Sequence, residues 1–115
     1  MAPQRVKSPG AAAFWLVRTM DLSIVIPVRN EEPNVEPLYH ELVEVLGATG
    51  RSFEVLIVDD GSTDGTFAKL TALQARDGRL RVIRFRRNFG QTAAFSAGFA
   101  HARGAIIVTS DGDLQ

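Results

Sequence analysis

The chain reads Phe53-Glu54-Val55-Leu56-Ile57-Val58-Asp59-Asp60-Gly61-Ser62, an apolar run that ends in a polar turn. Valine, leucine and isoleucine dominate residues 53–58, and this composition is typical of a buried β-strand. Aspartate, glycine, serine and threonine crowd residues 59–65, which predicts a turn. Apolar residues then recur at helical spacing until Asp77-Gly78. Strand, turn and helix in this order form one step of an α/β fold.

The same order repeats on both sides of this step. Strands are predicted at 22–26 (ended by Pro27), 53–58, 80–85 and 105–109, and helices at 33–46, 66–76 and 91–102. The last strand is apolar throughout and is predicted to be buried. Small residues in the third helix would let it lie close on a sheet. We therefore expect an α/β fold with a mainly parallel four-stranded sheet flanked by three helices.

Bulk properties exclude several classes of protein. The 115 residues carry zero formal net charge, so global charge does not favour nucleic acid, and none is expected as a partner. Without cysteine there is no disulfide or thiolate site. No apolar segment approaches the roughly 20 residues that a membrane helix needs. Residues 1–20 are predicted to be a disordered leader, and residues 21–115 a single domain.

Polar and acidic clusters follow three of the predicted strands: residues 27–31, 59–62 and 111–113. The carboxyl ends of parallel strands meet at one edge of a sheet, where α/β folds bind ligands. Five acidic residues at one edge repel one another unless a cation or hydrogen-bond donors compensate. Asp111 and Asp113, separated by one glycine, have the oxygen ligands that a hard divalent cation prefers.

Five arginines between residues 79 and 87 allow two interpretations: a solvated strand edge, or donors to phosphate groups, with Arg86 and Arg87 as the candidates. His40 and His101 are expected at the surface, because each lies on a predicted helix away from the polar clusters.

Together these motifs resemble the family-2 glycosyltransferases of the GT-A fold, and most closely the polyprenyl-phosphate (dolichyl- or undecaprenyl-phosphate) glycosyltransferases. The matching segments are 23–27 with Asn30-Glu31, 58–66, 87–90 with Ala93-Ala94 and Ala97-Gly98, 102–104, and 111–115. The resemblance covers residues 21–115 and implies the N-terminal, Rossmann-like nucleotide-sugar-binding part of such a domain, truncated at its C-terminus.

The resemblance also implies roles for individual residues. Nucleotide-sugar binding falls to Pro27, Arg29, Glu31, Val58, Asp59, Asp60, Asp111 and Gly112, and metal binding to Asp111, Asp113 and Gln115. The metal would be Mg²⁺ or Mn²⁺. Gly112 stands where the family often has alanine; it keeps both carboxylates but loosens the backbone between them.

The implied activity is inverting transfer of a sugar from a nucleotide diphosphate sugar, of the UDP-glucose or GDP-mannose type, to a polyprenyl phosphate. The full-length protein is then expected in the cytoplasm at the inner face of the membrane. Its catalytic residues and membrane contacts are expected beyond Gln115, so the 115-residue chain alone should be inactive. The alternative is a truncated, non-catalytic nucleotide-binding module or gene remnant. A dinucleotide-binding domain is disfavoured, because residues 27–31 contain no glycine where a Gly-x-Gly-x-x-Gly turn would be needed.

Overall fold

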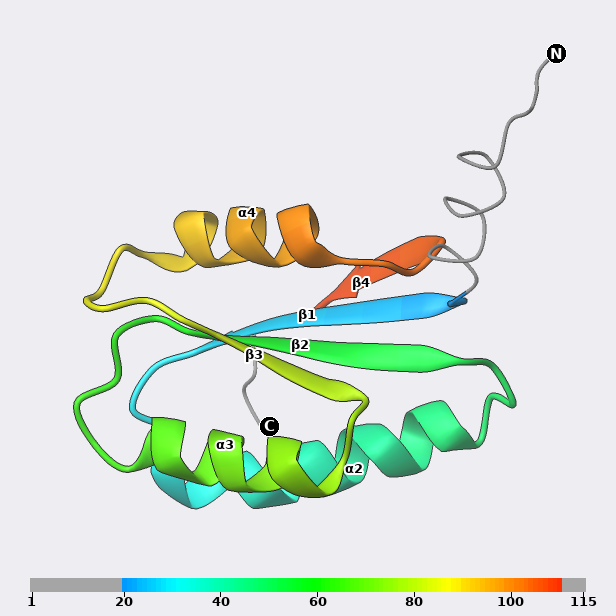
Figure 1. Cartoon of the computed structure of the whole chain (residues 1–115), viewed down its shortest axis with the longest axis horizontal. Helices are drawn as coiled ribbons and strands as arrows, with labels where there is room; N and C mark the ends of the chain where they lie inside the picture. The colour runs from blue at the N-terminus through cyan, green and yellow to red at the C-terminus, as the bar shows by residue number, and fades with distance from the viewer. Residues whose placement is uncertain (1–19, 111–115) are drawn as a thin grey trace, which may run out of the picture.

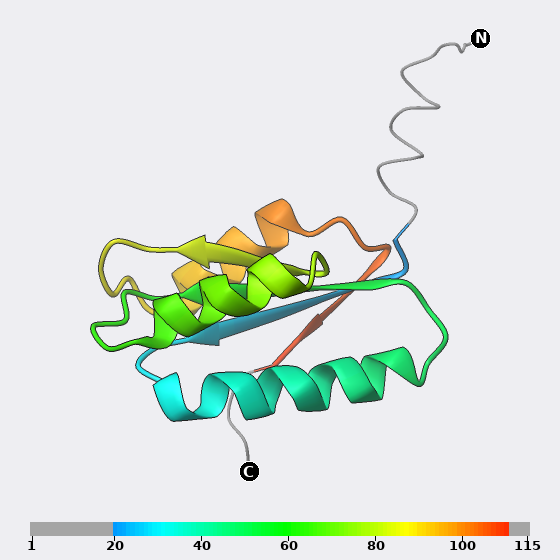
Figure 2. The same cartoon turned by 60° about the horizontal axis from the view of Figure 1, so that its bottom comes forward.

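A computed structural model describes residues 20–110 and arranges them as one sheet between two layers of helices (Figure 1). The four strands are β1 (Leu22–Val28), β2 (Phe53–Asp59), β3 (Leu80–Arg84) and β4 (Ile106–Thr109). All pairings are parallel, and the strand order is β3-β2-β1-β4. Helices α2 (Val35–Gly47) and α3 (Thr66–Arg76) cover one face, and α4 (Gln91–His101) covers the other (Figures 1 and 2). The predicted α/β fold, with four parallel strands and three helices, is confirmed.

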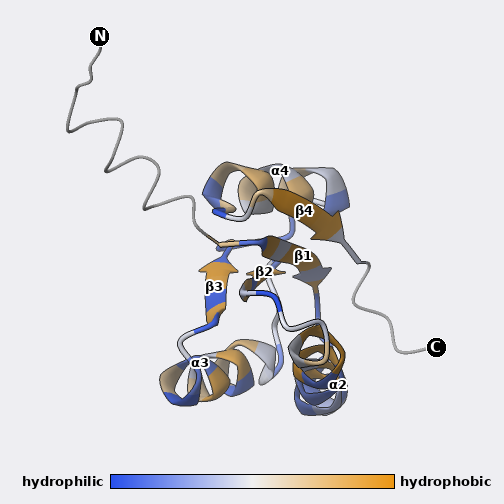
Figure 3. Cartoon of the chain, turned by 90° about the vertical axis from the view of Figure 1, so that its right-hand side faces the viewer, coloured by the Kyte–Doolittle hydropathy of each residue, from blue (hydrophilic) through white to orange (hydrophobic). Residues whose placement is uncertain are grey.

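The main hydrophobic core lies between the sheet and helices α2 and α3. Alternate residues of β1 and β2 point to this face, as the two-residue period of a strand requires. The buried members of this core are Ile24, Ile26, Val28, Val35, Leu38, Tyr39, Leu46, Phe53, Val55, Ile57, Leu70, Leu73 and Leu80. Figure 3 shows the two helices facing the sheet across this layer.

Helix α4 packs on the opposite face through small residues, as its sequence predicts. Ala94 and Gly98 are buried, whereas Phe99 is 47% exposed. A Cβ atom added to Gly98 would lie 2.2 Å from Cγ1 of Val25 in β1. The absence of a side chain at Gly98 therefore allows the close approach of α4 to the sheet.

Strand β1 runs through Pro27 to Val28, so the prediction that Pro27 ends it is wrong. Pairing with β2 includes Pro27, whereas pairing with β4 stops at Val25. The Val25 carbonyl accepts a hydrogen bond from Ser110 on the β4 side, and the Val28 carbonyl accepts one from Asp60 on the β2 side. By this alternation the backbone nitrogen of Pro27 lies on the β4 side of β1, past the last residue that pairs with β4. The missing N–H of Pro27 therefore removes no hydrogen bond from the sheet.

Several further boundaries differ from the prediction by one or two residues. The chain enters α2 through a 3-10 turn, η1 (Glu32–Asn34), which holds Pro33, and the α-helix itself begins at Val35. Strand β3 ends at Arg84, one residue early. Among residues 20–110, no helix is long and apolar enough to cross a membrane.

Strand β4 is exposed, so the prediction that it is buried is wrong. Ile106, Ile107 and Val108 are 56%, 42% and 44% exposed. The strand lies at the edge of the described sheet, pairs only with β1, and has only four residues. An apolar run indicates a strand, but burial depends on neighbouring elements, and the described residues supply none beyond β4.

Candidate functional site

Three loops meet at the carboxyl edge of the sheet: 29–34 after β1, 60–65 after β2, and 85–90 after β3. Asn30, in the left-handed region with φ 54°, joins the first two. Its Oδ1 accepts hydrogen bonds from the backbone N–H groups of Thr63 (2.8 Å) and Asp64 (3.3 Å). Glu32 Oε1 accepts a third, from the Gly65 N–H at 2.9 Å. The first two loops therefore form one hydrogen-bonded unit.

Asp60 joins the second loop to the third. Its carboxylate accepts hydrogen bonds from the Phe89 N–H (2.7 Å to Oδ1), the Gly90 N–H (3.0 Å to Oδ2) and Asn88 Nδ2 (3.0 Å to Oδ2). Asp60 is only 5% exposed, so these donors replace the water molecules that its carboxylate loses on burial. For Asp60, hydrogen-bond donors thus supply the compensation that the acidic edge needs.

Gly61 brings the second and third loops into direct contact. It adopts φ +74°, and an added Cβ would lie 2.3 Å from the Arg87 carbonyl carbon and 2.4 Å from the Asn88 nitrogen. Both the backbone conformation and the lack of space require glycine here.

A pocket of about 160 Å³ opens between these loops and the start of α4. It is lined by Pro27, Val28, Arg29, Asp60 and Gln91. The structure therefore brings three predicted site residues, Pro27, Arg29 and Asp60, to one place. The sequence analysis did not identify Gln91. Its signal is weak, because a glutamine at the first position of a helix is an ordinary polar surface residue.

Three other predicted residues lie near this edge but do not line the pocket. Val58 is fully buried in β2. Glu31 uses Oε1 to accept a hydrogen bond from Asn34 Nδ2 at 2.8 Å. Asp59 is fully buried; its Oδ1 accepts a hydrogen bond from the Ser62 N–H at 2.9 Å, whereas its Oδ2 has no partner among the described residues.

The predicted metal ligands Asp111, Asp113 and Gln115, together with Gly112, lie outside the described residues. Within residues 20–110, no group of three His, Asp or Glu side chains is placed to hold a metal ion. Strand β4 is parallel to β1 and the Ser110 N–H donates to the Val25 carbonyl at 3.1 Å, so the carboxyl end of β4 points toward the edge that carries the pocket. Two carboxylates separated by one residue remain suitable donors for Mg²⁺ or Mn²⁺.

The five arginines of residues 79–87 have different surroundings. Arg79 and Arg81 form ion pairs with Asp77 and Glu54, both at 2.8 Å, whereas Arg84 and Arg87 lie over the rings of Phe67 and Phe89, both 4.1 Å from the ring centroid. Arg86 and Arg87 are exposed on the third loop. A phosphate contact by these two residues therefore remains a prediction.

A buried polar network lies at the other end of the sheet, around Glu54, which is 1% exposed. The carboxylate accepts hydrogen bonds from Ser23 Oγ (2.6 Å), the Arg103 N–H (2.7 Å) and Arg81 NH1 (2.8 Å). Burial alone would raise the pKa of Glu54, but these three donors hold it below its ordinary value. The network fixes the segment that leads from α4 into β4.

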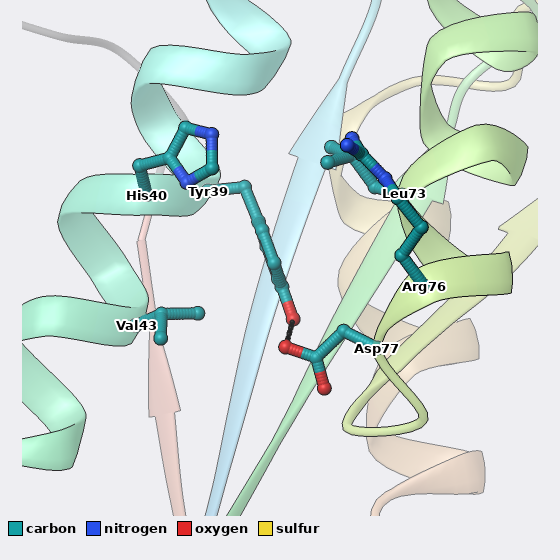
Figure 4. A pocket seen from close by; sticks show the side chains of 6 residues that line it. All are labelled: Tyr39, His40, Val43, Leu73, Arg76 and Asp77. Atoms are coloured by element: carbon teal, nitrogen blue, oxygen red, sulfur yellow. Dashed lines mark hydrogen bonds between the residues drawn. The ribbon is translucent and has the colours of Figure 1, made fainter.

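A second pocket, of about 220 Å³, lies between α2 and α3, across the sheet from α4 (Figure 4). Tyr39 donates a hydrogen bond to Asp77 Oδ2 at 2.5 Å beside it. Burial, together with this hydrogen bond, raises the pKa of Tyr39 well above its usual range. His40 lines this pocket and is exposed, as is His101, in agreement with the expected surface positions.

Comparisons with known proteins give the same fold and one family. The chain is 44% identical over 100 residues to a "Dodecaprenyl-phosphate galacturonate synthase" of Rhizobium johnstonii, covering 86% of the chain and 30% of that protein. It is 43% identical over 95 residues to an "Undecaprenyl-phosphate 4-deoxy-4-formamido-L-arabinose transferase" of Pseudomonas paraeruginosa, covering 82% of the chain and 28% of that protein. The chain thus spans about a third or less of the length of these relatives.

Two solved structures are similar in fold. The mannosyltransferase PcManGT of Pyrobaculum calidifontis, in complex with GDP-Man and Mn²⁺, has a TM-score of 0.68 at 22% identity, over 90% of the chain and 34% of that protein. Residues 1–349 of TarS from S. aureus, in complex with UDP-GlcNAc, have a TM-score of 0.70 at 27% identity, over 82% of the chain and 27% of that protein. The predicted GT-A type of α/β fold is confirmed. The sequence model of "Glycosyl transferase family 2" matches residues 23–115. The chain therefore belongs to glycosyl transferase family 2.

Proposed function

We propose that this chain is the nucleotide-sugar-binding part of an inverting, metal-dependent glycosyltransferase whose acceptor is a polyprenyl phosphate. The observation that carries the proposal is the pocket at the carboxyl edge of the sheet. Pro27 from the end of β1, Arg29 from the loop after β1 and Asp60 from the loop after β2 line it together. Family membership and relatives named for transfer to polyprenyl phosphates support the same conclusion.

The pocket residues fit the nucleoside end of a donor. Pro27 offers an apolar surface to a planar base, whereas the side chain of Val28 belongs to the main core. Asp60, held by three donors, presents a rigid carboxylate that can accept a hydrogen bond from a base N–H. Arg29 is exposed at the rim, where its guanidinium can reach ribose or phosphate oxygens.

Asp111 and Asp113, with Gln115, would hold the cation. The carboxyl end of β4, the strand that precedes these residues in the sequence, points toward the same edge as the pocket. When bound, Mg²⁺ or Mn²⁺ acts as a Lewis acid that neutralises the charge on a leaving nucleotide diphosphate.

A polyprenyl phosphate acceptor is consistent with the residues that line the pocket. A phosphate monoester carries roughly −1.5 to −2 charge near neutral pH and needs little help from a general base. Within residues 20–110, Asp60 is the carboxylate that lines the pocket, and three hydrogen-bond donors already hold it. Because the chain spans about 30% of its relatives' length, we place acceptor binding, catalytic residues and contact with the inner face of the membrane beyond residue 115.

Isothermal titration of UDP and GDP, with and without Mn²⁺, tests the proposal on a longer protein that contains this chain. We expect nucleotide binding that requires the metal and that Asp113→Asn weakens at least tenfold, since a carboxylate ligand is lost. Glu44→Gln, an exposed change on α2, serves as the matched control. A folded protein that binds neither nucleotide in the presence of Mn²⁺ contradicts the proposal.

A further inference from the structure

Gln91 lines the proposed nucleotide pocket, but no role has been assigned to it so far. It is the first residue of α4 and follows Gly90, whose N–H donates to Asp60 Oδ2 at 3.0 Å. This hydrogen bond fixes the start of the helix beside the Asp60 carboxylate. Gln91 is exposed, so its amide is accessible to a ligand in the pocket that it shares with Asp60.

The hydrogen bonds already made by Asp60 limit what it can offer a ligand. An ionised carboxylate has about four acceptor positions. Three donors, from Asn88, Phe89 and Gly90, occupy most of them, with the single Gly90 N–H shared between Oδ2 (3.0 Å) and Oδ1 (3.3 Å). About one position remains, so Asp60 can accept a single further N–H.

A nucleobase presents more than one polar group on its pairing edge, so a second protein group is needed to read it. The Gln91 amide has two N–H donors and a carbonyl acceptor. Arg29 supplies donors only, and Pro27 and Val28 offer no polar side-chain atom. Arg29 can also donate, but Gln91 directly follows Gly90, whose N–H donates to Asp60 Oδ2, so the Gln91 amide is the donor that the backbone ties to the Asp60 carboxylate.

On the basis of the proposed function, we propose that Gln91 selects the base of the donor nucleotide by donating from Nε2 to a ring carbonyl adjacent to the N–H that Asp60 accepts. Uracil and guanine both present a ring N–H beside a carbonyl. Cytosine and adenine, held in the same position, place a bare ring nitrogen where uracil and guanine have the ring N–H, so two acceptors would face each other at Asp60. The pair therefore selects keto bases and rejects amino bases.

The test measures binding of UDP, GDP, CDP and ADP to the whole chain in the presence of Mn²⁺. We expect UDP or GDP to bind at least tenfold more tightly than CDP and ADP, and the UDP and GDP titrations show which keto base is the ligand. Gln91→Ala should weaken the preferred nucleotide by about 3- to 10-fold, the loss of one neutral hydrogen bond. CDP and ADP should change less than about twofold, since that hydrogen bond is absent with them.

Two further variants separate base reading from other effects. Gln91→Glu keeps the shape but removes the amide donor, so it should weaken the preferred nucleotide at least as much as Gln91→Ala. Thr92→Ala changes the next exposed residue of the same helix turn, which does not line the pocket, and should leave all four affinities unchanged.

The outcomes distinguish this inference from the proposed function. If the wild-type chain binds UDP or GDP and Gln91→Ala binds them equally well, the role of Gln91 is wrong and the proposed function stands. Equal loss for all four nucleotides, or for pyrophosphate with Mn²⁺, also overturns base reading by Gln91. A wild-type chain that binds none of the nucleotides overturns both.

Discussion

At the scale of single residues, Asp60 combines a structural task with a place in the pocket. Its carboxylate orders the third loop and faces the space where we place the base. Asp60→Asn keeps the size of the side chain but turns one acceptor oxygen into a donor that faces other N–H groups. We expect the free energy of unfolding to fall by about 1–3 kcal/mol, the cost of a buried donor left without its acceptor. Urea denaturation measures this change.

The control for Asp60 is Glu36→Gln, which alters an exposed carboxylate in the first turn of α2. Its effect should stay within about 0.5 kcal/mol. An Asp60→Asn protein as stable as the control would show that the hydrogen bonds to the third loop contribute little.

The site residues show which roles a sequence can reveal. The sequence predicts that Pro27, Arg29 and Asp60 lie at one edge, because they belong to clusters at the carboxyl ends of predicted parallel strands, whereas the binding role of each rests on the family resemblance. Gln91 was not predictable, because its place in the pocket depends on how the Asp60 hydrogen bonds aim the start of α4. Val58 shows the opposite case: its position at the strand end is correct, but its side chain is fully buried.

At the scale of elements, the close contact between α4 and β1 depends on Gly98. Alanine raises helix propensity by about 1 kcal/mol relative to glycine. Its Cβ would nevertheless meet the fully buried, branched side chain of Val25 at 2.2 Å. We expect Gly98→Ala to lower the free energy of unfolding by about 1–2 kcal/mol overall, because overpacking outweighs propensity.

Gly47→Ala is the matched control for Gly98. Gly47 also lies in a helix, and an added Cβ there meets no atom within 4 Å. The propensity gain should therefore appear alone, as a small rise in thermal stability. Equal stabilisation of Gly98→Ala and Gly47→Ala would show that there is room for a Cβ atom between α4 and the sheet at position 98.

The Glu54 network should make the attachment of α4 and β4 sensitive to acid. Its folded pKa lies below the ordinary value of 4.5, so ionised Glu54 contributes stability fully above that pH. This contribution is lost as pH falls from 4.5 through the lower folded pKa. Urea denaturation should therefore show Glu54→Gln less stable than wild type near neutral pH, with the difference shrinking in acid. A difference that does not change with pH would contradict the role of the charge.

The elements themselves were largely predictable, because each has its own period and end signals. Burial was less so. The apolar sequence of β4 indicates a strand, but its exposure follows from its place at the sheet edge, which depends on strand order. Strand β1 likewise continues through Pro27 because its pairing with β4 ends at Val25, before the proline.

At the scale of the whole molecule, β4 is an apolar strand at the edge of the sheet formed by residues 20–110, and no strand among those residues pairs with its outer side. Such edges pair with other chains unless charge blocks them. We expect the 115-residue chain to self-associate as its concentration rises, and Ile107→Lys to reduce this association. Light scattering after size-exclusion chromatography measures it. Val45→Lys, at a residue 60% exposed on α2, is the control and should have little effect. A wild-type monomer at all concentrations, with a cooperative melt, would contradict the prediction.

The isolated chain should bind a nucleotide without transferring sugar. It spans 30% of the relative from Rhizobium johnstonii, and we place the acceptor residues outside it. A transfer assay with a nucleotide sugar, Mn²⁺ and a polyprenyl phosphate should therefore give no product. Product formed by this chain alone would show that its own residues suffice for catalysis.

The strand order also sets a sequence of events during synthesis on the ribosome. The core between the sheet and helices α2 and α3 contains no residue beyond Leu80, apart from the adjoining Val82. That layer can form as soon as β3 has been synthesised. At that point the side of β1 that pairs with β4 is still unpaired, because β4 lies more than 80 positions later in the chain. Because α4 and β4 are absent from this core, we expect the nascent chain to form the two loops after β1 and β2 before α4 brings Gln91 to the pocket.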